Sequence, residues 1–403
     1  MPGMLRSLQG LLIRQRQTRS ASTSSGETRR IRQAGTGMAY RRTAGLLLLV
    51  NGMLWAAITG VATAGRGVWI AALGLIPAGW GVWWISRWVW GENRVGMTFA
   101  DDPPRSAPSR PAGMRKARPW EMLLLLPCAA LDAVWLLNCL LAVLHQLMPS
   151  YPSGILRVML PLALTLGVLL GKRNGAAYGV SLWRWVLPLA AVWVMATVLR
   201  NQGMELLYPL LGRGWMATGL GTLTGLGTLW SCALLFVLPD CDMQKTSPPG
   251  KKKDHTIHYV LLPLLAVALL ALALACLGAW YAADMNTGLR LLLVGRSGGS
   301  MMLSGLWAAF WLLGLMTAYC TSLMAAQKLI CRVWRGCRDW LPVVVIGILA
   351  AVMVWVWHDG SPRWAEWLLP WRFMLWALAA AWAGIRRGAG AKGQGKQQEK
   401  RRK

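Results

Sequence analysis

The 403-residue chain is too apolar to form a water-facing globular surface, because 55% of its residues are hydrophobic and its mean hydropathy is +0.41. A formal net charge of +28 could indicate nucleic-acid binding, but the Lys and Arg residues lie between apolar runs and in the two tails rather than in one basic domain. These values predict a protein of the lipid bilayer and exclude a nucleic-acid partner.

Two polar tails flank the apolar part of the chain. Residues 1–43 are rich in Ser and Arg with Glu27 as the only acid, which predicts a disordered, basic cytoplasmic extension, although the composition also resembles a transit peptide. Residues 386–403 are rich in Gly, Gln and Lys and are expected to form a second disordered cytoplasmic tail on anionic lipid. Residues 44–385 between them are predicted to form one transmembrane domain.

This domain contains ten apolar stretches of roughly 17 to 25 residues, the length needed to cross a hydrocarbon core about 30 Å thick. The sequence therefore predicts an all-α, polytopic membrane protein with about ten transmembrane helices. The stretches are residues 44–63, 68–88, 122–147, 155–171, 183–199, 215–238, 259–281, 301–325, 340–357 and 371–385.

The distribution of basic residues tests this number of spans. Lys and Arg near span ends are retained on the cytoplasmic side, and most of the 43 Lys and Arg residues fall there if the N-terminus is inside. One span more or fewer in the middle would place Lys251, Lys252 and Lys253 opposite Arg335 and Arg338. Ten spans with both termini in the cytoplasm fit the charges best.

The sequence contains no pattern that predicts an enzyme, a metal site or a cofactor. The eight Cys residues form no C-x-x-C pair, and H-E-x-x-H and a phosphate-binding loop do not occur. His255 and His258 beside Asp254 could form a metal clip, but the Lys residues directly before them favour a solvated loop.

Glycines gather in the sixth stretch, at Gly219, Gly221, Gly225 and Gly227. One interpretation is close helix packing, because Gly221 and Gly225 form a G-x-x-x-G pattern. The other is a broken helix, because several glycines weaken a span and the freed backbone groups are tolerated where they line a polar cavity.

The first stretch is predicted to be interrupted as well, at Asn51 and Gly52. The first and sixth spans are corresponding members of two five-span halves, which is the pattern of a 5+5 inverted-repeat (LeuT-like) transporter fold. We therefore place a candidate substrate site between Asn51 and Gly52 on one side and Gly219 and Gly221 on the other. Backbone N–H groups at a half-helix start could hold a ligand carboxylate there.

Asp132 is the acid placed most clearly at membrane depth, in the third stretch. An intramembrane acid costs about 2.5 to 3.5 kcal/mol on insertion scales, so Asp132 should face the bundle interior and have a partner. It shares a helix face with Cys128, Trp135 and Cys139. We include it in the candidate substrate site, with a structural hydrogen bond to a neighbouring helix as the alternative.

Four short landmarks follow one another along residues 40 to 385. They are Ala64–Ala71, similar to an A-G-x-D-A-W-L-A motif; Leu147–Pro152, similar to L-P-x-T-P; Leu207–Gly214, similar to L-x-P-L-L-x-x-G; and Gly295-Arg296 before a Trp-rich span. Their order resembles the B subunit of GerA-type spore germinant receptors, the endospore germination permeases of the amino acid–polyamine–organocation superfamily. Gly67 and Ser297 replace acids of the family pattern, and the Glu expected near Ser231 is missing, so the chain is identified as a divergent member.

This resemblance implies a spore germination protein in the spore inner membrane, with A- and C-type receptor subunits as partners and a small germinant such as an amino acid as ligand. The alternative is an amino acid secondary transporter that moves its substrate with an ion. A third hypothesis is a scaffold that has kept the fold and lost its ligand.

The ten-span topology predicts where inserted reporters will lie. A reporter fused after Lys253 or Arg338 should be cytoplasmic, and one inserted near Asn286 or Asp359 should be external, because the positive loops stay inside. Paired reporters with opposite compartment requirements would measure this. An external reporter after Arg338 would overturn the ten-span topology.

Overall fold

The computed structural model describes residues 44–91, 123, 125–147, 153–170, 211–237, 257–276, 301–334, 338, 340–356 and 368–385. Within these ranges the ordered elements are helices, and no strand occurs. Nine of the ten predicted spans fall wholly or mostly in this part of the chain, and the described residues of each are helical. The predicted span 183–199 and both predicted tails lie outside the described residues.

The first two spans form a helical hairpin. Together they make a 47-residue apolar run, Ala44–Trp90, which as one straight helix would be about 70 Å long, more than twice the thickness of a hydrocarbon core. Gly65 breaks this run with a φ of 59°, a left-handed conformation that favours glycine. The elements are an α-helix over residues 44–55, η1 (Ala56–Gly60), α2 (Val61–Ala64), η2 (Gly65–Gly67), α3 (Val68–Ser86) and η3 (Arg87–Gly91).

The predicted interruption of the first span at Asn51 and Gly52 is wrong in position. Both residues lie inside the regular α-helix, and the irregular segment is the π-helix Ala56–Gly60, which begins four residues later. A Cβ atom on Gly52 would lie 2.6 Å from Cγ2 of Val267. The glycine is therefore explained by the close approach of another helix and not by a break in its own.

The sixth span changes helix type in its middle, which confirms that the glycine-rich stretch is irregular. It begins as the α-helix α8 (Trp215–Gly225), continues as the 3₁₀ segment η6 (Leu226–Ala233) and ends as α9 (Leu234–Val237). A 3₁₀ segment of eight residues is unusually long, and in mid-helix such a segment often marks a hinge or strain.

The remaining described helices complete two groups. They are α5 (Leu126–Leu147), α6 (Ser153–Leu170), α10 (His258–Cys276), α12 (Met301–Val333), α13 (Trp340–Val356) and an unlabelled last helix, Leu368–Ile385. The eighth predicted span was too short, because α12 continues as a helix from residue 325 to Val333.

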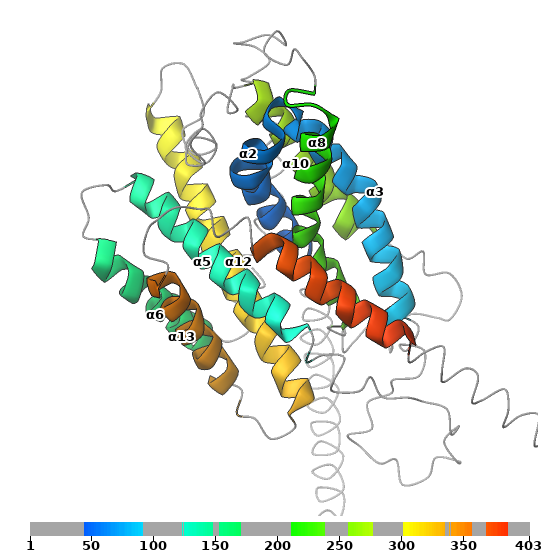
Figure 1. Ribbon diagram of the computed structural model, residues 1–403. Helices are drawn as coiled ribbons and strands as arrows, with labels where there is room; N and C mark the ends of the chain where they lie inside the picture. The colour runs from blue at the N-terminus through cyan, green and yellow to red at the C-terminus, as the bar shows by residue number, and fades with distance from the viewer. Residues whose placement is uncertain are drawn as a thin grey trace, which may run out of the picture.

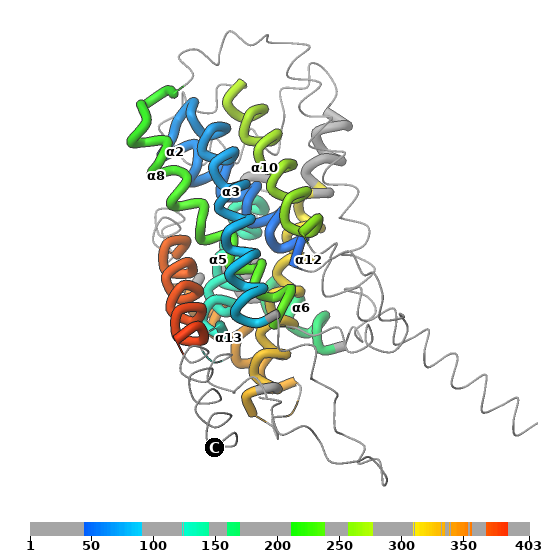
Figure 2. The backbone as a smooth tube through the Cα atoms, turned by 90° about the vertical axis from the view of Figure 1, so that its right-hand side faces the viewer, coloured from blue at the N-terminus to red at the C-terminus, as the bar shows by residue number. Residues whose placement is uncertain are grey.

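One group contains α2, α3, α8 and α10, and the other contains α5, α6, α12 and α13. Figure 1 shows the groups beside each other, and Figure 2 shows α3, α8 and α10 packed together in the first group. The first group takes spans one, two, six and seven, and the second takes spans three, four, eight and nine. Each group thus combines corresponding spans of the two five-span halves, as expected for a LeuT-like repeat.

The turns that precede α3 and α8 pack against each other. Arg213 Nη1 donates a hydrogen bond of 2.7 Å to the carbonyl oxygen of Ala62 in α2. Gly212 has a φ of 51°, and a Cβ atom on it would lie 2.9 Å from the backbone nitrogen of Arg66. These two turns lie on one side of the protein, which agrees with the ten-span topology.

Glycines of the sixth span let helices approach closely. A Cβ atom on Gly221 would lie 2.9 Å from Cβ of Ala64, and one on Gly227 would lie 2.0 Å from the carbonyl oxygen of Leu369 in the last helix. Gly219 differs, because it is exposed and a Cβ atom there would have nothing within 4 Å. The packing interpretation therefore applies to Gly221 and Gly227.

This contrast predicts different outcomes for the same substitution at two positions of α8. Gly221→Val should lower the amount of membrane-inserted protein and its thermal midpoint, because the new side chain must displace α2. Gly219→Val is the matched control, with the same propensity change and open space around it. Fluorescence-detected size-exclusion chromatography would compare them. Equal yields and midpoints for the two variants would contradict the packing role of Gly221.

Candidate functional site

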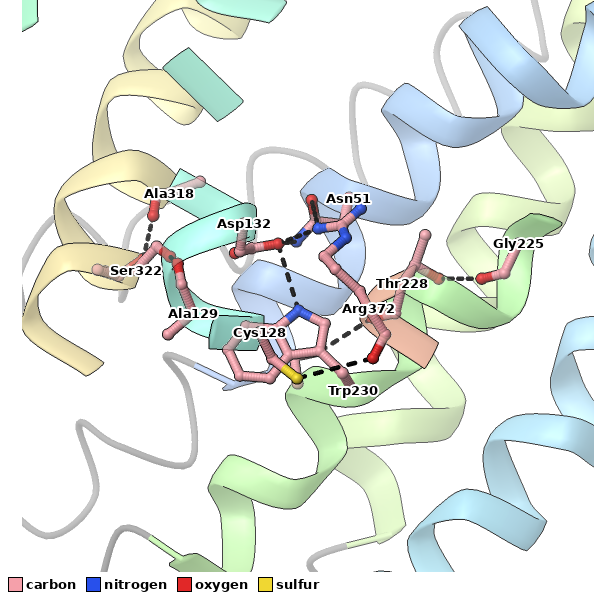
Figure 3. Close-up of polar contacts among 12 residues, drawn as sticks. Asn51, Cys128, Ala129, Asp132, Gly225, Thr228, Trp230, Ala318, Ser322 and Arg372 are labelled. Atoms are coloured by element: carbon pink, nitrogen blue, oxygen red, sulfur yellow. Dashed lines mark hydrogen bonds and ion pairs between the residues drawn. The ribbon is translucent and has the colours of Figure 1, made fainter. Parts of the chain in front are cut away.

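A buried ion pair joins the second group of helices to the last helix. Asp132 on α5 pairs through Oδ1 with Nη1 of Arg372 on helix Leu368–Ile385, and both side chains have no exposed surface. Figure 3 shows the two side chains pointing toward each other between the helices. The prediction that Asp132 is buried and has a partner is confirmed. The partner is a full counter-charge, which reduces the cost of an acid in the membrane.

Side chains from the first and sixth spans meet the same carboxylate oxygen. Asn51 Nδ2 donates to Asp132 Oδ1 over 2.9 Å, and Trp230 Nε1 donates to it over 3.3 Å (Figure 3). Nη1 of Arg372 also lies 3.4 Å from Oδ1 of Asn51. We call Asn51, Asp132, Trp230 and Arg372 the polar cluster. It brings together spans one, three, six and ten.

Three buried polar atoms of the polar cluster are unpartnered. Among the described residues, Nε and Nη2 of Arg372 and Oδ2 of Asp132 have no hydrogen-bond partner, although all three atoms are buried. A buried polar atom without a partner costs about 1 to 3 kcal/mol, and more when the group is charged. The cluster therefore presents two donors and one acceptor that an additional polar molecule could satisfy.

Two side chains of α5 make further contacts with Arg372, one with its guanidinium group and one with its backbone. Its Cζ lies 5.8 Å from the centroid of the Trp135 ring, within the range of a cation–π contact. Cys128 Sγ contacts the backbone oxygen of Arg372 at 3.7 Å. Cys128, Asp132 and Trp135 are spaced at helical intervals on α5, and the predicted shared face is the one that meets the last helix.

Threonine hydroxyl groups accompany the irregular segments of spans one and six. Thr59 Oγ1 donates to the carbonyl of Trp55 over 3.2 Å, and Thr228 Oγ1 donates to that of Gly225 over 2.8 Å. Trp55 Nε1 in turn donates to Thr224 Oγ1 over 3.1 Å, which ties the two spans together. Hydroxyl bonds to carbonyls one turn earlier often bend helices, and they can satisfy carbonyl groups at such irregularities.

The five predicted site residues separate into two sets. Asn51 and Asp132 are hydrogen-bonded to each other in the polar cluster. Gly52 faces α10, Gly221 packs against α2, and Gly219 is exposed, so the three glycines lie outside the cluster. A role for any of the five in substrate binding stays a prediction.

Sequence reasoning missed Arg372 and Trp230. The predicted tenth span began at residue 371 and so placed Arg372 at its start, whereas the helix already includes Leu368 and buries the arginine completely. The signal available was a basic residue inside an apolar run, Leu368-Leu369-Pro370-Trp371-Arg372-Phe373. Trp230 carried no distinguishing signal, because it is one of 26 Trp residues.

The polar cluster is poorly suited to holding a metal ion. The described residues include no group of three His, Cys, Asp or Glu side chains that could hold a metal ion. A permanently charged guanidinium beside the single carboxylate also opposes a second cation. The cluster can instead orient a small polar molecule by hydrogen bonds.

No protein-family model and no curated protein matches this sequence. Among solved structures, the chain is similar to a mutant of the manganese transporter from Eremococcus coleocola, with a TM-score of 0.51 and 13% identity over 88% of this chain and 78% of that chain. It is also similar to that transporter in complex with an aromatic bis-isothiourea substituted compound, with a TM-score of 0.50 and 13% identity over 87% of this chain and 78% of that chain.

At this level of identity the likeness shows the fold alone. The apolar helices, the two groups of spans and these similarities agree, and the chain is an integral membrane protein with the LeuT-like transporter fold.

The ion pair predicts non-additive effects of mutation. Asp132→Asn should destabilise the protein by about 3 to 5 kcal/mol, because it leaves the buried guanidinium without its counter-charge, and Arg372→Gln should have a similar effect. The double variant should lose clearly less stability than the two single variants lose together, since it contains neither charge. Thermal midpoints of the purified full-length proteins would give this cycle. Additive losses would contradict a coupled pair.

Proposed function

We propose that this protein is a secondary transporter for a small organic solute, with amino acids as the candidate substrates, and that the solute binds at the polar cluster. The observation that carries the proposal is the presence, among the described residues, of three unpartnered polar atoms in a buried, charged cluster at the junction of spans one, three, six and ten. In inverted-repeat transporters, substrates bind near the midplane at the interface of the repeats, and alternating access moves one group of helices against the other.

The backbone next to the cluster supports this proposal. Asn51 is followed by the π-helix Ala56–Gly60, and Trp230 lies within the 3₁₀ segment Leu226–Ala233. Irregular backbone at membrane depth is tolerated where it is buried in protein or lines a cavity. The first and sixth spans, which contribute Asn51 and Trp230 to the polar cluster, can thus change shape more readily than uniform α-helices.

Manganese, the cargo named for the similar transporter, is a poor candidate for this chain. A manganese site requires several hard oxygen ligands, whereas the polar cluster offers one carboxylate that is already paired with Arg372. A solute with its own hydrogen-bonding groups matches the unfilled donors and acceptor better. We therefore favour an organic substrate over a metal ion.

A second candidate function rests on the sequence landmarks. The order of Ala64–Ala71, Leu147–Pro152 and Leu207–Gly214 resembles the B subunit of GerA-type receptors, which implies a permease-like subunit that binds a germinant and signals to A- and C-type subunits in the spore inner membrane. The same cluster would then sense its ligand without moving it. Affinity purification of the tagged protein from spores would test this, because a receptor subunit should carry A- and C-type subunits with it.

Uptake by reconstituted protein tests the transport proposal. Proteoliposomes containing the full-length chain should accumulate a labelled amino acid above empty liposomes when a proton or sodium gradient is imposed. Trp230→Phe should reduce this uptake by about tenfold, because it removes the N–H donor to Asp132 and keeps the ring.

Trp83→Phe is the matched control, since Trp83 is also buried but packs against Phe236, away from the cluster. It should transport as wild type does. An absence of uptake across all amino acids and both gradients would reject the transporter and leave the receptor subunit and the scaffold that has lost its ligand. Equal losses in the two variants would reject the polar cluster as the site.

A further inference from the structure

The two unpartnered donors of Arg372 lie on the same edge of its guanidinium group. Nη1 is already used, by Asp132 and Asn51. Nε and Nη2, which have no partner among the described residues, form the side edge of the planar group and direct two nearly parallel N–H bonds outward. Such a fork matches the two oxygens of a carboxylate.

We propose that the Nε–Nη2 edge of Arg372 binds the carboxylate of the solute, an inference that rests on the solute-binding role proposed above. It differs from the sequence-based prediction, which placed the carboxylate at backbone N–H groups between Asn51 and Gly52 on one side and Gly219 and Gly221 on the other. Those glycines lie outside the polar cluster, whereas Arg372 is completely buried within it. The proposal therefore assigns the solute carboxylate to two side-chain N–H donors and not to backbone N–H groups at the start of a half-helix.

Charge favours a carboxylate over a phosphate. Arg372 is the only buried cation among the described residues, and Asp132 already neutralises it. A phosphate dianion would add two uncompensated charges in a poorly polarisable interior, whereas a carboxylate adds one. A solute that also carries an ammonium group adds none, and its N–H bonds could satisfy Oδ2 of Asp132.

The surrounding contacts fix the orientation of the fork. Trp135 covers a face of the guanidinium, and the bond to Asp132 holds its Nη1 end. A planar group held on one face and at one end loses little freedom when it binds a carboxylate. The edge is therefore preorganised before the solute arrives.

Four small probes separate the carboxylate from the ammonium group. The full-length protein in lipid nanodiscs is titrated with L-alanine, L-alaninamide, propionate and propionamide, and again with the corresponding leucine series to allow for the size of the site. The measured quantity is the shift of the thermal midpoint with probe concentration, from which an affinity follows. Each acid should bind at least about tenfold more tightly than its amide, since only the acid accepts both N–H bonds with a charge.

Arg372→Lys tests the fork itself. Lysine keeps the positive charge beside Asp132 but offers no planar pair of donors, so the preference for acid over amide should fall by about tenfold or more. If this variant does not fold, the comparison of acids with amides on the wild-type protein still decides the proposal. Trp83→Phe serves as the control that should keep the preference, because Trp83 packs against Phe236 and is not part of the polar cluster.

Three results would overturn the inference. The first is equal affinities for acid and amide, and the second is an unchanged preference for acid over amide in Arg372→Lys. The third is the absence of any midpoint shift with all acids, which would mean that the Nε–Nη2 edge binds only water. Binding of the acids without uptake into proteoliposomes would reject transport and support the fork. Uptake that is equally fast for acids and amides would support transport and reject the fork.

Discussion

The architecture depends on one buried ion pair, between Asp132 on α5 and Arg372 on the last helix. Each of these charges alone would be costly at membrane depth, and either could be retained only with a partner. The pair therefore requires that the third and tenth spans lie in contact. The hydrogen bonds of Asn51 and Trp230 to the same carboxylate extend this requirement to the first and sixth spans.

The first and sixth spans satisfy this requirement without being uniform helices. Their π-helical and 3₁₀ segments lie beside threonine hydroxyl groups that bond back to the main chain, as Thr59 and Thr228 do. In lipid, each freed backbone group needs such an internal partner. The local sequence thus compensates for irregularity where the polar cluster is built.

Close packing around the cluster uses small residues rather than polar ones. Lipid tails are as apolar as leucine, so helices in membranes gain little from burying apolar surface against each other and rely on close contact instead. Gly52 against Val267, Gly221 against Ala64 and Gly227 against the carbonyl of Leu369 are three such contacts. They hold the irregular spans one and six at short distances from α10, from each other and from the last helix.

The sequence by itself determined the class of fold, because apolar runs of membrane length and the placement of Lys and Arg record contact with lipid directly. It also marked Asp132, since an acid inside an apolar run is visible without a structure. The position of the irregularity in span one and the partners of Asp132 depended on the tertiary structure. A helix's own residues do not reveal which distant span it meets, so Arg372 resembled one more charge at a span end. For the same reason the sequence left both close packing and a cavity open at the glycines, and only their neighbours decided between them.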